Sequence, residues 1–201
     1  MVFVNLKTKE IQLKIVYYGP GRGGKTTNLE YLNQKFRDRI KTEMVSLKTQ
    51  NDRTLFFDFL PIGLGSIKGY DIRIQLYTVP GQVKYNATRK LVLKGVDGVV
   101  FVADAQQEKR AKNVESLNNL YENLKTHNID IFDIPLVLQY NKVDLKESDI
   151  PILAVETLQN DLNSRLKVPA FEASALTGRN VVPTLKKIIS MTMASVQDKI
   201  K

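Results

Sequence analysis

The sequence predicts an α/β fold, in which a six-stranded, mostly parallel sheet with one antiparallel edge strand carries helices on both faces. Three observations lead to this prediction. Apolar runs of strand length alternate with longer stretches of helical period along the 201 residues. The composition, with 43% apolar and 25% charged residues, is ordinary for a folded domain. No internal repeat or composition break divides the chain, so we expect one domain over residues 1–201 with a fraying tail from about residue 197.

The first strand and the first helix follow each other directly. Residues 11–18 are an apolar run that ends at a glycine, which predicts a strand. Residues 26–36 are predicted to be a helix, because Leu29, Leu32 and Phe36 recur at helical spacing and share one stripe.

The next two predicted strands, residues 55–60 and 72–79, lie close together in the sequence. Only a short connector separates them, and it holds one proline and three glycines. A connector of this length and composition favours an antiparallel pairing over a helical crossover, so we expect these two strands to pair antiparallel at one edge of the sheet.

The second half of the chain continues the alternation and completes the prediction of six strands and about five helices. The further predicted strands are residues 98–103, 136–140 and 169–173, and the further predicted helices are residues 113–127, 154–162 and 182–196.

The composition excludes several kinds of chemistry. The chain contains no cysteine, which removes disulfides, thiolate metal sites, thiol nucleophiles and thiol-linked lipid anchors. His127 is the single histidine, so a histidine metal cluster is excluded as well. No apolar run reaches the ~18 residues of a membrane span, and no signal-peptide pattern opens the chain. We therefore expect a cytoplasmic protein with no direct membrane anchor.

The chain is basic, with 30 Lys and Arg against 21 Asp and Glu and a formal net charge of +9. Such a surface should attract anions, including nucleotides. The basic residues are scattered and no signature of a nucleic-acid-binding module is present, so we expect no nucleic-acid partner. An RNA-linked function, with salt-sensitive RNA binding, is the alternative that this charge leaves open.

The segment after the first predicted strand matches the phosphate-binding loop pattern of Gly, four residues and Gly-Lys-Thr. Because a helix follows, backbone N–H groups can converge on a phosphate at the helix N-terminus, where the dipole adds positive charge. Lys25 supplies a point charge for the β- and γ-phosphates, and the hydroxyl of Thr26 can ligate a Mg²⁺ that bridges them. The candidate phosphate-binding residues are Gly19, Gly21, Gly23, Gly24, Lys25, Thr26 and Thr27.

The polar run Asn141-Lys142-Val143-Asp144 follows the strand at 136–140, and it indicates which base is bound. The carboxyl ends of such strands are where open α/β sheets bind ligands. Guanine presents two adjacent donors, N1–H and its amine, and the carboxylate of Asp144 can accept both, whereas adenine cannot offer that pair. The stem of Lys142 can lie along the base, and Asn141 can tie this loop to the phosphate loop.

A second polar stretch, Ser174-Ala175-Leu176, follows the strand at 169–173, and the N–H of Ala175 could reach the guanine O6. These three residues complete the candidate guanine-binding set with Asn141, Lys142 and Asp144. A phosphate-loop kinase or ATPase is an alternative interpretation. That function predicts adenine binding, which the Asn141 to Asp144 motif disfavours.

With these motifs in this order, the chain resembles the Ras-like small GTPases over essentially its whole length. In particular it resembles the bacterial Ras-like GTPases that set front-rear polarity in gliding motility. The run Thr78-Val79-Pro80-Gly81-Gln82 stands where most small GTPases have Asp-x-x-Gly. The resemblance implies a monomeric switch that binds GTP and GDP with Mg²⁺, hydrolyses GTP slowly, and is recruited to a cell pole by partners. Those partners are polarity or motility effectors and an MglB-like roadblock-fold activator.

The resemblance also implies roles for residues between the two motifs. Thr54 is expected to place its hydroxyl on Mg²⁺, so that Thr26 and Thr54 are the metal ligands, and Gly81 is expected to bind the nucleotide. Gln82 is expected to orient the attacking water. Arg53 is expected to act as an arginine finger supplied within the chain.

Thr78 is the main departure from the usual small-GTPase pattern. In most small GTPases an aspartate at this position holds a water on Mg²⁺. The neutral hydroxyl of Thr78 attracts the cation far less than a carboxylate does, so we predict weaker retention of Mg²⁺. An alternative function follows from the same residue: a nucleotide-locked scaffold that binds GTP and hydrolyses it negligibly.

Residues 55–60 could pair in two registers. Side chains alternate along a strand, so the odd-numbered residues, all apolar, share one face, and the even-numbered ones, with Asp58 among them, share the other. A slide of two residues keeps an apolar set facing the core, whereas a slide of one inverts it. We hypothesise that such a slide carries Arg53 and Thr54 toward the nucleotide.

Overall fold

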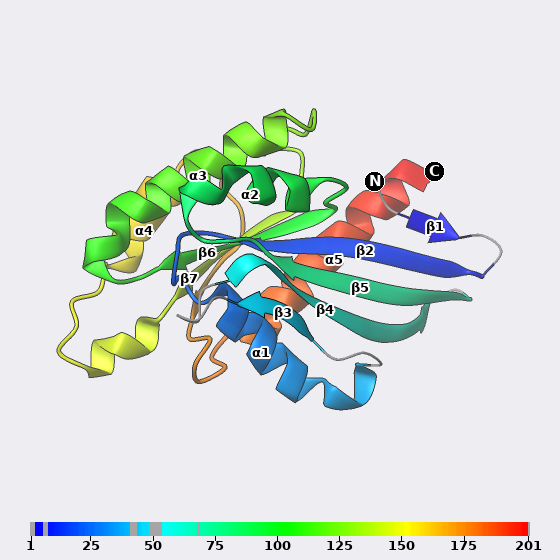
Figure 1. The fold of residues 1–201 in the computed structure, drawn as a ribbon, viewed down its shortest axis with the longest axis horizontal. Helices are drawn as coiled ribbons and strands as arrows, with labels where there is room; N and C mark the ends of the chain where they lie inside the picture. Colours follow the sequence, from blue (N-terminus) through cyan, green and yellow to red (C-terminus); the bar gives the residue numbers. More distant parts are fainter. Residues whose placement is uncertain (1–2, 6–7, 41–43, 49–53, 68, 201) are drawn as a thin grey trace.

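The computed structural model describes residues 3–5, 8–40, 44–48, 54–67 and 69–200, and their strands form one sheet (Figure 1). The strand order is β3-β4-β5-β2-β6-β7-β8, and β1 pairs with β2 beside this path. The strands are β1 (Phe3–Asn5), β2 (Glu10–Tyr18), β3 (Val45–Lys48), β4 (Thr54–Ile67), β5 (Tyr70–Thr78), β6 (Gly98–Asp104), β7 (Leu136–Asn141) and β8 (Ala170–Ala173). The α-helices are α1 (Lys25–Lys35), α2 (Asn86–Leu93), α3 (Arg110–Lys125), α4 (Val155–Leu162) and α5 (Val181–Ile200). The 3₁₀ helices are η1 (Arg37–Arg39), η2 (Val83–Tyr85), η3 (Gln107–Lys109) and η4 (Val143–Glu147).

The centre of the sheet is parallel, as predicted. β2 pairs in parallel with β5 and β6, and β7 and β8 continue the parallel pairing outward from β6. β4 pairs antiparallel with β5, which confirms the pairing expected from the short connector. All six predicted strands are present, and the predicted α/β class is confirmed.

Two strands were not predicted, and they bring the sheet to eight strands within the described ranges. β1 pairs antiparallel with β2, and β3 pairs antiparallel with β4. β3 therefore occupies the edge position that we had predicted for residues 55–60. Both added strands are short, at three and four residues, and so short a run carries little periodicity to detect.

The predicted connector after residue 60 is mostly strand. β4 continues through Pro61 and two glycines to Ile67, and its register against β5 shifts between Gly63 and Gly65. Glycine inside a strand often marks such a bulge, and the sequence alone did not distinguish it from a loop signal.

Two helices also differ from the prediction. α2 was not assigned from the sequence, although it follows the Gly81-Gln82 segment directly through η2. The last helix is described as far as Ile200, beyond the point at which we expected it to fray.

Helices cover both faces of the sheet (Figure 1), with α2, α3 and α4 on one face and α1 and α5 on the other. The alternation of β2 divides its side chains between these layers: Val16 and Tyr18 face the first, and Ile15 and Tyr17 face the second. β6 is buried at every residue, as expected of a central parallel strand covered on both sides. None of the helices in the described ranges is long and apolar enough to cross a membrane.

The side chains of β4 alternate as predicted where they are described. Asp58 and Leu60 are fully buried, whereas Phe57 and Phe59 are half-buried. The rings of Phe57 and Phe59 contact Tyr77 of β5, with centroids 5.8 and 4.9 Å away. The structure holds one register, with Phe59 opposite Tyr77, so the two-register hypothesis stays a prediction.

Candidate nucleotide-binding site

The phosphate-binding loop lies between the end of β2 and the start of α1, as predicted. Gly24 is the N-cap residue of α1, with a φ of 94°, and no side chain caps the first turn of the helix. The N–H groups at this helix end can therefore bind an anion, and the helix dipole adds positive charge there. Thr26 and Thr27 lie half-buried in this first turn.

Two glycines allow the loop to approach its neighbours closely. A Cβ added at Gly19 would lie 2.1 Å from the carbonyl oxygen of Val102, and one added at Gly24 would lie 2.1 Å from Nδ2 of Asn141. The positive φ of Gly24 adds a second reason for glycine at that position. Packing against β6 and β7 therefore requires glycine at positions 19 and 24.

Lys25 is almost fully buried and folds back over the loop. Its Nζ donates to the carbonyl oxygens of Gly19, at 3.1 Å, and Pro20, at 2.7 Å. Burial, together with the smaller effect of the charge on Arg89, lowers the pKa of Lys25 to about 7. A phosphate in the loop would supply the negative charge that this buried ammonium lacks.

Asn141 joins the two ends of the site. Its Nδ2 donates to the carbonyl oxygen of Gly23 at 2.8 Å, and its Oδ1 accepts from the N–H of Ala175 at 2.8 Å. The side chain is 1% exposed at the end of β7. The predicted tie between the base-reading loop and the phosphate loop is therefore confirmed as a direct hydrogen bond.

Lys142 and Asp144 follow at the same edge of the sheet. The Nζ of Lys142 donates to Oδ2 of Asp104 at 2.6 Å and to Oε1 of Gln106 at 3.1 Å, which anchors this side chain to the end of β6. Asp144 is half-buried in η4. Within the described ranges its carboxylate makes no hydrogen bond or ion pair, so both oxygens can accept from a ligand.

The stretch after β8 corrects one expectation. The N–H of Ala175 is already bonded to Asn141, so in this arrangement it braces the asparagine instead of being free for a guanine O6. Ser174 is fully buried, and its Oγ accepts from the N–H of Thr177 at 3.1 Å. Leu176 is 79% exposed, as the outer residue of this turn.

Gly81 and Gln82 lie against the phosphate loop, as their predicted roles require. A Cβ added at Gly81 would lie 2.3 Å from the Cα of Gly21, so no other residue fits between these two segments. The Cγ of Gln82 lies 3.6 Å from the position that a Cβ on Gly21 would take. The Oε1 of Gln82 is buried without a hydrogen-bond partner, which leaves an acceptor next to the loop for a bound group.

Two predicted residues are not placed at the site. Arg53 lies outside the described residues. Thr54 is described only through its backbone, as the first residue of β4, where it pairs with Lys48 of β3. The roles predicted for both residues stay predictions.

The residues around Thr26 fit a hard divalent cation such as Mg²⁺. The Oγ1 of Thr26 donates its proton to Oδ2 of Asp58 at 2.5 Å, which leaves lone pairs of the hydroxyl oxygen for a cation. No cluster of three or more His, Cys, Asp or Glu side chains occurs in the part of the chain that the structure describes.

Sequence reasoning did not single out Asp58 and Arg89, which contact the candidate site residues in the structure. Asp58 did carry a signal, because it interrupts an otherwise apolar strand. Arg89 carried none, because α2 was not predicted. Both side chains are fully buried.

Arg89 holds the backbone that precedes Gln82. Its Nη1 donates to the carbonyl oxygens of Pro80, at 3.2 Å, and Gly81, at 2.9 Å. Its Nε and Nη2 donate to the hydroxyls of Tyr18 and Ser116, each at 2.9 Å. The guanidinium also lies 4.2 Å from the centroid of the Tyr18 ring. This buried arginine thus links α2, β2 and α3 to the segment against the phosphate loop.

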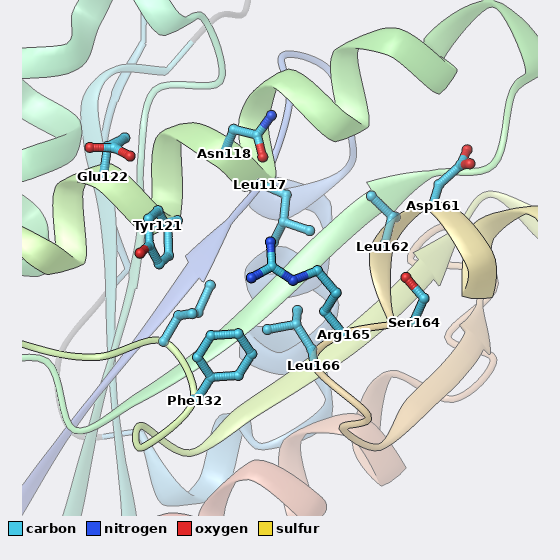
Figure 2. A pocket seen from close by; sticks show the side chains of 11 residues that line it. Leu117, Asn118, Tyr121, Glu122, Phe132, Asp161, Leu162, Ser164, Arg165 and Leu166 are labelled. Atoms are coloured by element: carbon cyan, nitrogen blue, oxygen red, sulfur yellow. The ribbon is translucent and has the colours of Figure 1, made fainter.

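A separate pocket of about 380 Å³ lies between α3 and the segment that follows α4 (Figure 2). Leu117 and Leu166 are among its apolar lining residues, and Arg165 extends across it with its guanidinium 6.0 Å from the centroid of the Phe132 ring. None of the predicted site residues lines it, so it is distinct from the candidate nucleotide site.

The chain is similar to known proteins along most of its length. A sequence model described as the Ras family matches residues 14–194. The mutual gliding-motility protein MglA of Myxococcus xanthus is 50% identical over 197 residues, which cover 98% of both chains. The Ras-related protein RABG3f of Arabidopsis thaliana is 25% identical over 92% of this chain and 84% of its own. The human Ras-related protein Rab-27B is 26% identical over 92% of this chain and 81% of its own.

Proposed function

Because the chain belongs to the Ras family of small GTPases, which bind guanine nucleotides and hydrolyse GTP, we propose that it is a GTP/GDP switch controlling cell polarity or gliding motility. The motility assignment is supported by the 50% identity to a protein named for gliding motility. The nucleotide assignment is supported above all by one observation: Asn141 bonds both the phosphate loop and the stretch after β8. That bridge sets the spacing between a phosphate site and a base site.

The residues divide into a phosphate end and a guanine end. At the phosphate end, the backbone of residues 19–27 and the side chain of Lys25 bind the β- and γ-phosphates. At the guanine end, Asp144 accepts from guanine N1–H and the guanine amine, and Lys142, held by Asp104, flanks the base. Ser174, Ala175 and Leu176 close this end, where the N–H of Ala175 braces Asn141.

A third group of residues is assigned to metal binding and hydrolysis. Thr26 and Thr54 ligate Mg²⁺, which when bound neutralises charge on the β- and γ-phosphates. The buried and unpartnered Oε1 of Gln82 supports its role in orienting the attacking water, and Gly81 brings this segment within reach of the loop. Arg53 stabilises charge that develops on the transferred phosphoryl group.

The switch acts through partners. An MglB-like roadblock-fold protein serves as activator by positioning Arg53 and Gln82, so hydrolysis is slow without it. Polarity or motility effectors bind one nucleotide state, and they recruit the cytoplasmic protein to a cell pole. These assignments rest on the resemblance to the gliding-motility protein.

The test of the base end compares nucleotides directly. Calorimetry should show GDP and GTP bound at micromolar concentration or tighter, with ADP and ATP at least about a hundredfold weaker, because adenine leaves the Asp144 carboxylate without donors. Asp144→Asn should shift the preference from guanine to xanthine nucleotides, because an amide N–H can donate to the xanthine O2 that replaces the amine. Equal affinity for ATP and GTP in the unmodified protein would refute the proposal.

A nucleotide-locked scaffold with negligible hydrolysis is a second candidate, and Thr78 is the residue that favours it. Single-turnover GTP hydrolysis, measured with and without a roadblock-fold partner, separates the two functions. A rate that the partner raises supports the switch, and GTP that stays intact in both conditions supports the scaffold.

A further inference from the structure

Asp58 is a buried carboxylate that receives two hydroxyl donors on one oxygen. Its Oδ2 accepts from Oγ1 of Thr26 at 2.5 Å and from Oγ1 of Thr78 at 2.7 Å. The N–H of Asp58 also donates to Oγ1 of Thr78 at 2.9 Å. Asp58 and Thr78 are both fully buried, on the antiparallel strands β4 and β5. The carboxylate therefore reaches the first turn of α1 from a neighbouring strand.

This arrangement fixes the direction of the Thr26 proton. A hydroxyl that ligates a cation uses an oxygen lone pair, so its proton has to point toward another acceptor. Here that acceptor is Asp58, and a charged acceptor makes the hydrogen bond stronger than a neutral one would. Partners of this kind orient metal ligands and raise their basicity.

Thr78 also acquires a role in this geometry. The Thr-x-Pro-Gly segment lacks the carboxylate that most small GTPases have at its first position. The cross-strand neighbour of Thr78 supplies a carboxylate instead, and the Thr78 hydroxyl donates to it. Compared with most small GTPases, the carboxylate therefore lies on β4 instead of β5, and it is within hydrogen-bond distance of Thr26.

A buried carboxylate needs compensating positive charge or hydrogen bonds to offset its desolvation. Two hydroxyl donors and the electrostatic attraction between Asp58 and the ammonium of Lys25 contribute here. A divalent cation beside Thr26 would add to that compensation. The same charge would in turn stabilise the bound cation.

We propose that Asp58 is the positioning carboxylate of the magnesium site, in place of the residue at position 78. It orients the Thr26 hydroxyl toward the cation and adds the negative charge that Thr78 lacks, and Thr78 holds Asp58 in place. The inference rests on the proposed nucleotide function, and it opposes our prediction from the sequence that Thr78 makes Mg²⁺ retention weak.

The test measures release of a fluorescent GDP analogue from the full chain as Mg²⁺ is varied, so it requires no hydrolysis. Asp58→Asn keeps the size of the side chain and removes its charge. We expect the Mg²⁺ concentration that half-maximally slows release to rise by about 10- to 100-fold, as for other partners of metal ligands. Release in EDTA should change by no more than about twofold, because the nucleotide contacts themselves remain. Asp161→Asn is the matched control, since that carboxylate pairs with Arg110 on the surface and should leave the Mg²⁺ dependence unchanged.

A transposed variant separates positioning from a purely structural role. Asp58→Thr combined with Thr78→Asp returns the carboxylate to β5, and we expect it to restore at least half of the lost Mg²⁺ response on a logarithmic scale. If Asp58→Asn does not fold, Thr78→Val provides the second measurement, because it leaves the Asp58 carboxylate in the chain and removes the hydroxyl that donates to this carboxylate and accepts from the Asp58 N–H. That variant should raise the half-maximal Mg²⁺ concentration by about three- to tenfold.

Three results would overturn the proposal: an unchanged Mg²⁺ response in Asp58→Asn, no recovery in the transposed variant, or no effect of Thr78→Val where it is the only folded variant. These results can be distinguished from failure of the proposed function, because GDP binding by the unmodified protein is measured first. Absence of GDP binding there refutes the function. GDP binding with a normal Mg²⁺ response that Asp58→Asn leaves unaltered refutes only the role of Asp58.

Discussion

Asn141 donates from its side-chain amide to the carbonyl oxygen of Gly23, at 2.8 Å across 118 residues of sequence. The other side of the same amide accepts from Ala175. One buried side chain therefore joins the proposed phosphate loop to the stretch after β8.

Asn141→Ala should weaken GDP binding at least about tenfold and lower the free energy of unfolding of the nucleotide-free protein by about 1–3 kcal/mol, because both former partners lose a buried hydrogen bond. Calorimetry and urea unfolding measure the two effects. Asn118→Ala, which removes an exposed amide on α3, serves as the control and should change neither quantity. Unaltered affinity in Asn141→Ala would show that the bridge does not organise the site.

Gly24→Ala should destabilise the protein by about 2–4 kcal/mol, because the added Cβ meets Asn141 at 2.1 Å and the backbone has a positive φ. Gly95→Ala is a matched control, since Gly95 also has a positive φ, of 72°, but has open space around it. The free energy of unfolding of that variant should fall by only about 1 kcal/mol, because backbone strain is its only cost. Equal losses in the two variants, measured by urea unfolding, would contradict the packing argument.

Gln82→Leu should reduce single-turnover GTP hydrolysis by about 100-fold or more, because it removes the amide expected to orient the attacking water. GTP affinity should stay within about threefold, since a side chain that acts only in the transition state adds little to ground-state binding. Gln107→Leu, at an exposed glutamine, controls for the loss of a surface amide. Full hydrolysis by Gln82→Leu in the presence of an activator would remove this residue from the mechanism.

Arg89→Met should lower the free energy of unfolding by about 3 kcal/mol or more, because the carbonyls of Pro80 and Gly81 lose a charged donor inside the core. Arg110→Met is the control, since Arg110 makes an exposed ion pair with Asp161 and its loss should leave unfolding unchanged within error. If Arg89 also positions the segment that carries Gln82, hydrolysis by Arg89→Lys should fall while GDP affinity holds. A fall in both together would indicate general loosening of the fold.

Local patterns were the part of the protein that could be predicted. The strand, glycine loop and helix around Lys25 were correct because glycine spacing and helical period encode local backbone geometry directly. The parallel strands β6 and β7 were found because strands buried on both faces are continuous apolar runs. β3 and α2 were missed because a short edge strand and a short surface helix carry too little periodicity.

The sequence by itself determined the fold class, through the alternation of strand-like and helical runs, and it located the two motifs for which we predict phosphate and guanine binding, since each motif is a run of neighbouring residues. Only the tertiary structure decided that Asp58 reaches Thr26 from another strand, that Arg89 holds the backbone of Gly81, and that Ala175 bonds Asn141. These contacts join residues from different elements. Their partners are chosen by strand pairing and helix packing, which no local pattern in the chain records.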